Sequence, residues 1–124
     1  MKENLIQQKS YSFALRIIKL YSYLTENKKE YVLSKQILRS GTSIGANVEE
    51  ALGAQSKSDF IAKLSIAYKE ARETSYWIRL MRDSDYLEND LAESILNDCT
   101  ELINIITAIL KSAKGRNEKT MKWK

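Results

Sequence analysis

The sequence contains no proline, no histidine, four glycines and one cysteine in 124 residues. Without proline, only glycine and polar clusters remain to interrupt a helix, so long continuous helices are expected. The lack of histidine excludes histidine-based catalytic triads, metal sites that use histidine, and the Glu-x-x-His pattern of di-iron bundles. A single cysteine, Cys99, excludes an internal disulfide and fits a reducing compartment.

Long hydrophobic runs are missing as well. No segment approaches the roughly 18 apolar residues of a membrane span. The first residues, MKENLIQQKSYSF, lack the apolar core and cleavage-like site of a secretory signal. These absences predict a cytoplasmic protein with no membrane partner, and no motif predicts a cofactor.

Apolar residues make up 44% of the chain and charged residues 29%, values that suit one soluble helical domain. The charge is concentrated at the end of the chain. Residues 115–124 hold four cations and one acid, so residues 1–114 carry 16 cations against 15 acids. We therefore expect a nearly neutral domain over residues 1–114, followed by a basic, disordered tail over residues 115–124.

The two ends of the predicted domain also differ in charge. Residues 1–28 contain five cations and two acids, whereas residues 85–114 contain two cations and six acids. Opposite charge on two segments can steer one subunit or partner against another.

Apolar residues recur at helical spacing in four segments, about 4–26, 29–53, 57–83 and 85–113. Gly53 is predicted to end the second segment, and Ser56 or Ser58 to cap the third. Asp85 is predicted to cap the fourth, and Gly115 to end it. Four amphipathic helices with short connections predict an all-α, antiparallel up-down four-helix bundle.

Two of the scarce glycines, Gly41 and Gly45, lie four residues apart inside the second predicted helix. Each costs about 0.5–1 kcal/mol relative to alanine in a helix interior. Both fall on the apolar arc, and the strand, lysine and hydroxyl residue of a phosphate loop are missing. We interpret the pair as a site of close helix packing, opposite the small residues Ala67 and Ala71 of the third helix.

Between Gln36 and Leu87 the motifs RSGTSIGAN, AQSKSDFI, KEARETSYW and DYL occur together, and CTELINIITAILKSAK follows. In this combination the chain resembles the bacterial four-helix-bundle family encoded in intervening sequences of 23S ribosomal RNA genes. The resemblance implies a homopentamer of bundles. It also implies kinship with the accessory protein of diversity-generating retroelements, a basic pentamer that engages a reverse transcriptase and nucleic acid. The family offers no catalytic residues, so a non-catalytic oligomeric scaffold is expected, although this chain is barely basic outside its tail.

Two predicted helices carry a second apolar line besides the core face. Such patches are seldom left exposed on a monomer, and aromatic side chains are enriched at interfaces. We therefore predict a subunit interface, although a wide bundle core that absorbs these residues is the alternative. The line on the third helix comprises Ala62, Ile66, Trp77 and Leu80, and that on the first helix comprises Tyr11, Leu15 and Ile18.

Cations on the third helix are candidates for contact with RNA, DNA or a nucleic-acid enzyme. Lys69, Arg72 and Arg79 lie along one line with Tyr76 beside them, which suits phosphate contact and base stacking. The alternative is a solvated face on which these cations pair with nearby acids, Glu70, Glu73 or Asp83. The protein would then be a protein-interaction module that does not bind nucleic acid.

The basic tail is the second candidate for nucleic-acid contact, because each copy in an oligomer would repeat it. Its cations are Arg116, Lys119, Lys122 and Lys124, with Trp123 between the last two.

Four carboxylates suggest a more remote alternative. Glu49, Glu50, Glu70 and Glu73 resemble the magnesium sites of all-α nucleotide pyrophosphatases, in which acids on adjacent helices hold the metal. The third glutamate of that motif would fall at Gly53, so the site is incomplete. Cys99 is expected to be a buried, inert thiol.

Overall fold

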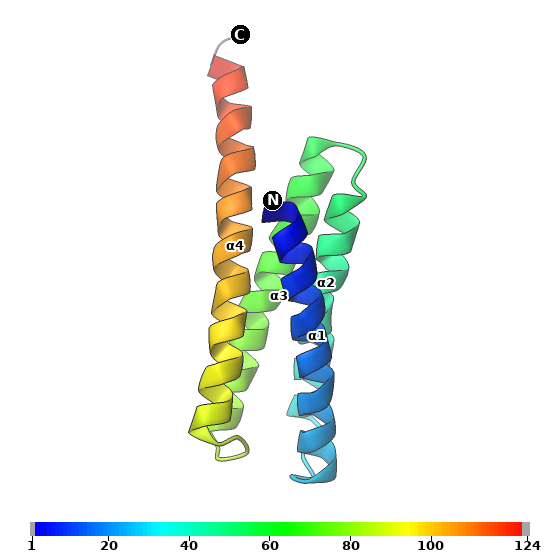
Figure 1. Ribbon diagram of the computed structural model, residues 1–124, viewed down its shortest axis with the longest axis vertical. Helices are drawn as coiled ribbons and strands as arrows, with labels where there is room; N and C mark the ends of the chain where they lie inside the picture. Colours follow the sequence, from blue (N-terminus) through cyan, green and yellow to red (C-terminus); the bar gives the residue numbers. More distant parts are fainter. Residues whose placement is uncertain (1, 123–124) are drawn as a thin grey trace.

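The computed structural model describes the backbone of residues 2–122 and the side chains of residues 4–115. This part of the chain is all-helical, with α1 (Lys2–Glu26), α2 (Leu33–Leu52), α3 (Lys57–Asp83) and α4 (Asn89–Lys122). Successive helices run in opposite directions (Figure 1). The predicted all-α, four-helix fold is confirmed. No helix among the described residues combines the length and the hydropathy that crossing a membrane requires.

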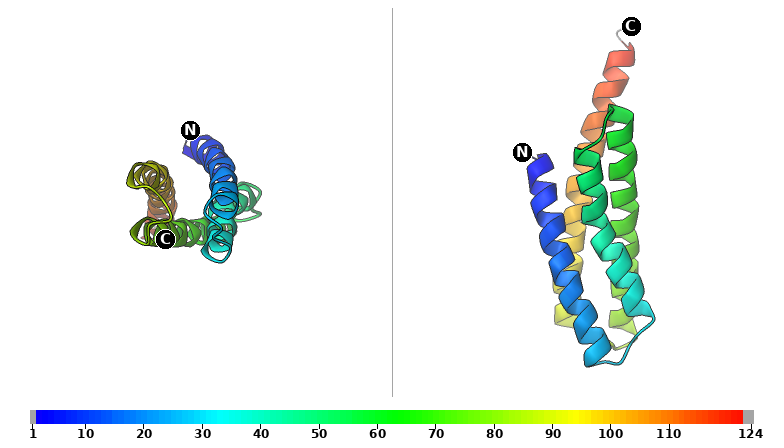
Figure 2. Two further views of the ribbon diagram at one scale, coloured as in Figure 1. Left: turned by 90° about the horizontal axis from the view of Figure 1, so that it is seen from below. Right: turned by 90° about the vertical axis from the view of Figure 1, so that its right-hand side faces the viewer.

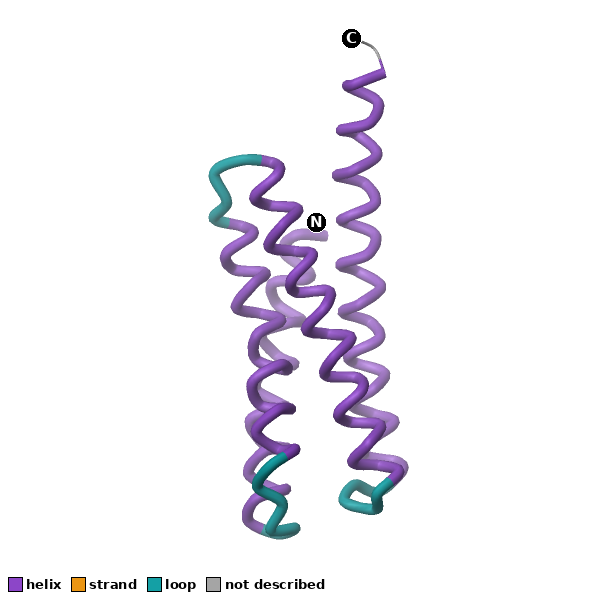
Figure 3. Tube along the Cα trace, turned by 180° about the vertical axis from the view of Figure 1, so that it is seen from behind, coloured by secondary structure: helices purple, strands orange, loops and turns teal. Residues whose placement is uncertain are grey.

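Each helix packs against the next in sequence, and α1 also packs against α4. Seen from below, α1 and α4 lie on opposite sides of the bundle, and α2 and α3 lie side by side along the edge that joins them (Figure 2). The α1–α4 seam is the least extensive of the four. The last turns of α4 project beyond the loop between α2 and α3 (Figure 3).

The core follows the apolar stripes of the four helices. On α4 the buried positions recur at three- and four-residue spacing, as the amphipathic pattern predicts, although Leu91 at the start of the predicted stripe is 36% exposed. Each fully buried leucine or isoleucine contributes about 1.5–3 kcal/mol of transfer free energy. The buried residues of α4 are Ala92, Ile95, Cys99, Leu102, Ile106, Ile109 and Ala113.

The start of α2 differs from the prediction. Lys29 has a φ of 56°, so the chain is still turning there, and the helix begins at Leu33. The Glu30 carboxylate accepts hydrogen bonds from the backbone N–H groups of Leu33 (3.0 Å) and Ser34 (2.7 Å). Burial would raise the pKa of Glu30, but these bonds and one from Val32 outweigh it and lower the pKa. A glutamate therefore caps α2, which the glycine and hydroxyl signals of the sequence did not indicate.

The other helix ends divide into confirmed and corrected predictions. Gly53 ends α2, and the Ser56 hydroxyl accepts from the Asp59 backbone N–H (3.1 Å) at the start of α3, as predicted. Asp85 does not cap α4, because it lies in the preceding loop with a φ of 69°. The helix begins four residues later, at Asn89.

The predicted end of α4 at Gly115 is wrong. The helix continues through that residue to Lys122, and no glycine in the described chain has the positive φ of a left-handed helix cap. A single glycine only weakens a helix by about 0.5–1 kcal/mol. Most of the predicted tail therefore has a helical backbone, whereas the side chains of Arg116, Lys119, Lys122 and Lys124 lie outside the described residues.

Gly41 and Gly45 do permit a close approach, but the neighbouring helix is α1 and not α3. A Cβ atom on Gly41 would lie 2.8 Å from Cγ1 of Ile17, and one on Gly45 would lie 3.3 Å from the backbone oxygen of Ser10. Ala67 and Ala71 are fully buried elsewhere, and the Ala71 carbonyl accepts from the Cys99 thiol of α4. The register of the α2–α3 hairpin predicts that the glycine pair lies opposite α3, and this prediction is wrong because α1 packs against the same arc of α2.

Candidate nucleic-acid interface

Charged motif residues meet on the exposed side of the α2–α3 seam. Arg39 of α2 forms ion pairs with Glu70 (3.0 Å) and with Glu73 of α3. Glu73 also accepts a hydrogen bond from Trp77 Nε1 (2.9 Å). The motifs RSGTSIGAN and KEARETSYW thus supply the two halves of one network that joins two helices.

Beneath this network the seam is closed by small hydroxyl residues. The hydroxyl groups of Ser40 and Thr74 lie 2.8 Å apart, and that of Thr74 also lies 2.8 Å from the carbonyl oxygen of Glu70. Both side chains are fully buried and satisfied. Burial of hydroxyl groups is tolerated only with such partners. These motif residues therefore serve helix packing.

The direct ion pairs of Glu70, Glu73 and Asp83 on α3 are made with other cations than those considered from sequence. Arg39 holds Glu70 and Glu73, and Arg82 pairs with Asp83 (2.8 Å). Within the described residues this leaves Lys69 and Arg72 without an acidic partner. Arg79 is different, because the pKa of Asp83 is lowered by its hydrogen bond from Arg82 and also by the charge of Arg79.

Two of these cations instead lie over aromatic rings. The guanidinium of Arg72 is 5.9 Å from the centre of the Tyr68 ring, and that of Arg79 is 6.0 Å from the centre of the Tyr76 ring. Cation–π pairs at exposed sites contribute only about 0.5–1 kcal/mol and leave the cation charged. The guanidinium of Arg72 therefore remains available to an anion, whereas that of Arg79 also interacts with the charge of Asp83.

Lys69 lies at a hollow of about 360 Å³ between α3 and α4, where two lysines of α4 join it. These two, Lys111 and Lys114, were not among the residues selected from sequence. Their i, i+3 spacing, which places them on one helix face, was the signal that could have identified them. None of the three lysines has an acidic partner in the described chain. The hollow is lined by Ser65, Tyr68, Lys69, Thr107, Leu110, Lys111 and Lys114.

The remaining predicted cations are placed differently. Arg79 is ten residues beyond Lys69, about 15 Å along α3 at 1.5 Å per residue, and does not line the hollow. The backbone positions of Arg116, Lys119 and Lys122 follow Lys114 along the same helix, although their side chains are outside the described part.

The predicted interface residues are mostly exposed. Tyr11 is 66% exposed, Leu15 49%, Ile66 41% and Leu80 36%. Trp77 differs, since it is partly buried against the core and its ring N–H is bound to Glu73. Trp77 therefore adds less exposed apolar surface to the predicted subunit interface than its position on the helix predicts.

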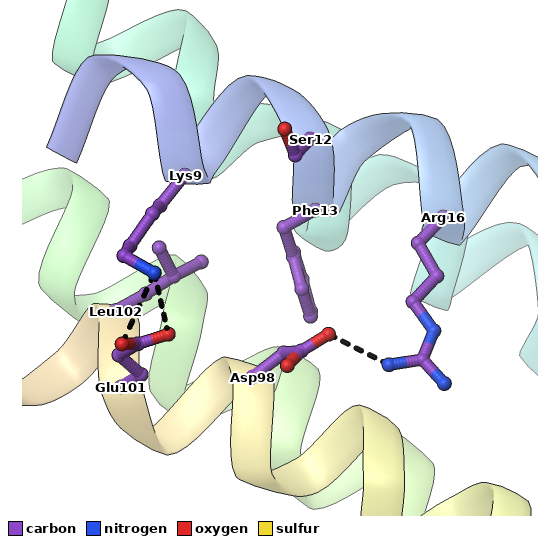
Figure 4. A pocket seen from close by; sticks show the side chains of 7 residues that line it. All are labelled: Lys9, Ser12, Phe13, Arg16, Asp98, Glu101 and Leu102. Atoms are coloured by element: carbon purple, nitrogen blue, oxygen red, sulfur yellow. Dashed lines mark hydrogen bonds and ion pairs between the residues drawn. The ribbon is translucent and has the colours of Figure 1, made fainter. Parts of the chain in front are cut away.

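A second hollow, of about 340 Å³, lies between α1 and α4 (Figure 4). Lys9 pairs with Glu101 (3.1 Å) on one side of Phe13, and Arg16 pairs with Asp98 (2.6 Å) on the other. The opposite charges of the two segments are thus realised as ion pairs between their helices. Both cations are neutralised, so this hollow suits a phosphate less well than the α3–α4 hollow.

The four carboxylates of the magnesium hypothesis are not brought together. Glu49 accepts from Gln7 Nε2 (3.0 Å), Glu50 pairs with Lys63 (3.2 Å), and Arg39 holds the other two. Across the described residues, no cluster of three or more acidic, histidine or cysteine side chains is arranged to hold a metal ion.

Cys99 is fully buried, as expected from its place on the α4 stripe. Burial raises the pKa of its thiol to about 12, so the group is protonated at neutral pH. A protonated, buried thiol is a poor nucleophile.

Comparisons with known proteins agree with the motifs. Residues 2–108 match the model of the 23S rRNA-intervening sequence protein family. A crystal structure from Bacteroides thetaiotaomicron VPI-5482, described as a protein of unknown function from the S23 ribosomal protein family, is 53% identical. The match covers 90% of this chain and 99% of that one, with a TM-score of 0.89. The curated proteins contain no match. The motif network, the four-helix fold and the match over most of the chain lead to one assignment: the chain belongs to the 23S rRNA-intervening sequence protein family.

Proposed function

We propose that this protein is a non-catalytic oligomeric scaffold that binds nucleic acid through its α3–α4 face. The observation that carries the proposal is the gathering of Lys69, Lys111 and Lys114 around one hollow with no acidic partner in the described chain. Lysines that are not neutralised internally attract phosphates and release counterions when they bind. Arg72 adds a fourth cation beside the hollow.

The oligomeric part of the proposal rests on exposed apolar side chains. Tyr11, Leu15 and Ile18 form one exposed stripe on α1, and Ile66 and Leu80 are exposed on α3. Exposed apolar side chains of this kind favour contact with another protein surface. A homopentamer is the assembly that the family resemblance implies, and five copies of the α3–α4 face would strengthen a weak contact by avidity. A cytoplasmic location, where Cys99 stays reduced, completes the proposal.

Light-scattering mass, measured at low and high salt with and without a mixed pool of short RNA and DNA, tests both parts. We expect an oligomer that resists salt, because apolar contacts hold it, and that gains mass with nucleic acid only at low salt. A monomer at both salt concentrations would contradict the scaffold.

The second candidate function is a protein-interaction module that does not bind nucleic acid. The exposed apolar side chains of α1 and α3 support a protein-interaction module as well as they support the nucleic-acid-binding scaffold. An oligomer whose mass is unchanged by the nucleic-acid pool, even at low salt, would select this candidate.

A further inference from the structure

We propose that the α3–α4 hollow receives an unpaired nucleobase, so that the nucleic acid bound here is single-stranded. This inference rests on the proposed function and narrows its ligand from nucleic acid in general to a strand with unstacked bases. It follows from the combination of an apolar floor, a cationic rim and an aromatic ring at one place.

The hollow has the size and lining of a small organic ligand site. Its volume of about 360 Å³ lies within the roughly 300–1,000 Å³ of such sites. Tyr68 and Leu110, both partly buried against the core, provide apolar surface between the lysines. A phosphate group by itself has no use for apolar surface, whereas the flat face of a base gains from covering it.

Tyr68 and Arg72 together resemble the stacking platforms of single-strand binding proteins. The guanidinium lies 5.9 Å from the centre of the ring, and Tyr68 is one of the residues that line the hollow. Bases that are splayed out of a strand stack on aromatic rings and on arginine planes. In a duplex the base faces are already stacked on each other, so a duplex can reach only the lysine rim.

The rim is arranged to hold phosphates on both sides of such a base. Lys69 projects from α3, and Lys111 and Lys114 come from α4. The hydroxyl groups of Ser65 and Thr107 also line the hollow and can each donate and accept at a base edge. Beyond Lys114 the helical backbone continues to Lys122 and projects past the α2–α3 loop, which extends the basic sequence in one direction (Figure 3).

The test is fluorescence anisotropy with a labelled short RNA, as a single strand and as the duplex of the same sequence, at one low salt concentration. A surface that reads only charge would prefer the duplex, since its charge density is higher. We expect the single strand to bind more tightly, which reverses that order. Equal or tighter duplex binding would overturn the inference and leave the proposed function standing. If neither form binds, the proposed function fails as well.

Variants of Tyr68 separate stacking from charge. Tyr68→Leu keeps apolar volume and removes the ring, whereas Tyr68→Phe keeps the ring and serves as the matched control. We expect Tyr68→Leu to weaken single-strand binding by about 5- to 150-fold, the equivalent of one lost base stack, and to leave duplex binding unchanged. Equal binding by the Leu and Phe variants would contradict the inference.

A measurement on the unaltered chain covers the case in which Tyr68→Leu does not fold. A single strand that carries the fluorescent base 2-aminopurine should change its emission on binding, and Lys111→Gln with Lys114→Gln should abolish the change. An emission that does not respond to saturating protein would overturn the inference. So would a polyglutamate chain that displaces the strand as effectively as unlabelled RNA, since the occupant would then be an acidic protein segment.

Discussion

The two seams of α1 show two ways of joining helices. Against α2, the helix lies so close that a Cβ atom on Gly45 would approach the Ser10 backbone oxygen to 3.3 Å. Against α4, it borders a hollow of about 340 Å³ and is connected across it by ion pairs. The α1–α2 seam depends on glycines, which have no side chain to keep the two helices apart. The α1–α4 seam depends on ion pairs that solvent and salt can reach. Mutations should therefore have large effects on the first seam and small effects on the second.

The largest effect is expected from Gly45→Leu. The new side chain would press on the backbone of α1 at Ser10, which cannot rotate away as a side chain can. Overpacking of this kind costs about 1–3 kcal/mol or more. Urea unfolding measures it, with Ala46→Leu, at the exposed neighbouring position, as the control. Unchanged stability of the Gly45 variant would show that the α1–α2 seam is not close-packed.

An intermediate effect is expected at the turn that leads from α1 to α2, where Glu30 caps the second helix. Glu30→Ala removes the acceptor for the Leu33 and Ser34 N–H groups and should cost about 0.5–2 kcal/mol near neutral pH.

Glu30 also gives this turn a dependence on pH. Because folding lowers the pKa of Glu30, its contribution is present above the ordinary value of 4.5 and is lost as the pH falls through the lower, folded value. The stability difference between the wild type and Glu30→Ala, measured by urea unfolding at neutral and at acidic pH, should therefore shrink in acid. A difference that stays constant would mean that the carboxylate does not act as the cap.

The smallest effect is expected at the α1–α4 seam. A double-mutant cycle with Arg16→Ala and Asp98→Ala should give a coupling of about 0.2–1 kcal/mol, because the two side chains are 33% and 49% exposed. The coupling should decrease as salt is added. A coupling energy above that range, or one that salt does not change, would contradict the view that the α1–α4 seam is held by exposed ion pairs.

Much of the fold could be predicted because the signals involved are local. The bounds of α3, the cap at Ser56 and the buried stripe of α4 follow from spacing and from side chains next to the backbone groups they bind. The starts of α2 and α4 were misplaced, since a glutamate cap and an aspartate in a left-handed turn have weaker sequence signatures.

The candidate site was predicted only in part. Lys69 and Arg72 were identified on their own helix, but Lys111 and Lys114 belong to a distant segment whose overall charge is acidic. Two of the three acids considered as partners on α3, Glu70 and Glu73, pair with Arg39 of α2 instead. Reasoning within one helix could not find a partner on another.

The sequence by itself determined four amphipathic helices, the side of each that enters the core, and the family motifs. Only the tertiary structure decided that Gly41 and Gly45 admit α1, that Arg39 takes up Glu70 and Glu73, and that lysines of α4 complete the hollow beside Lys69. The physical reason is that helical periodicity assigns a residue to a face, whereas the neighbour opposite that face depends on how all four helices pack together.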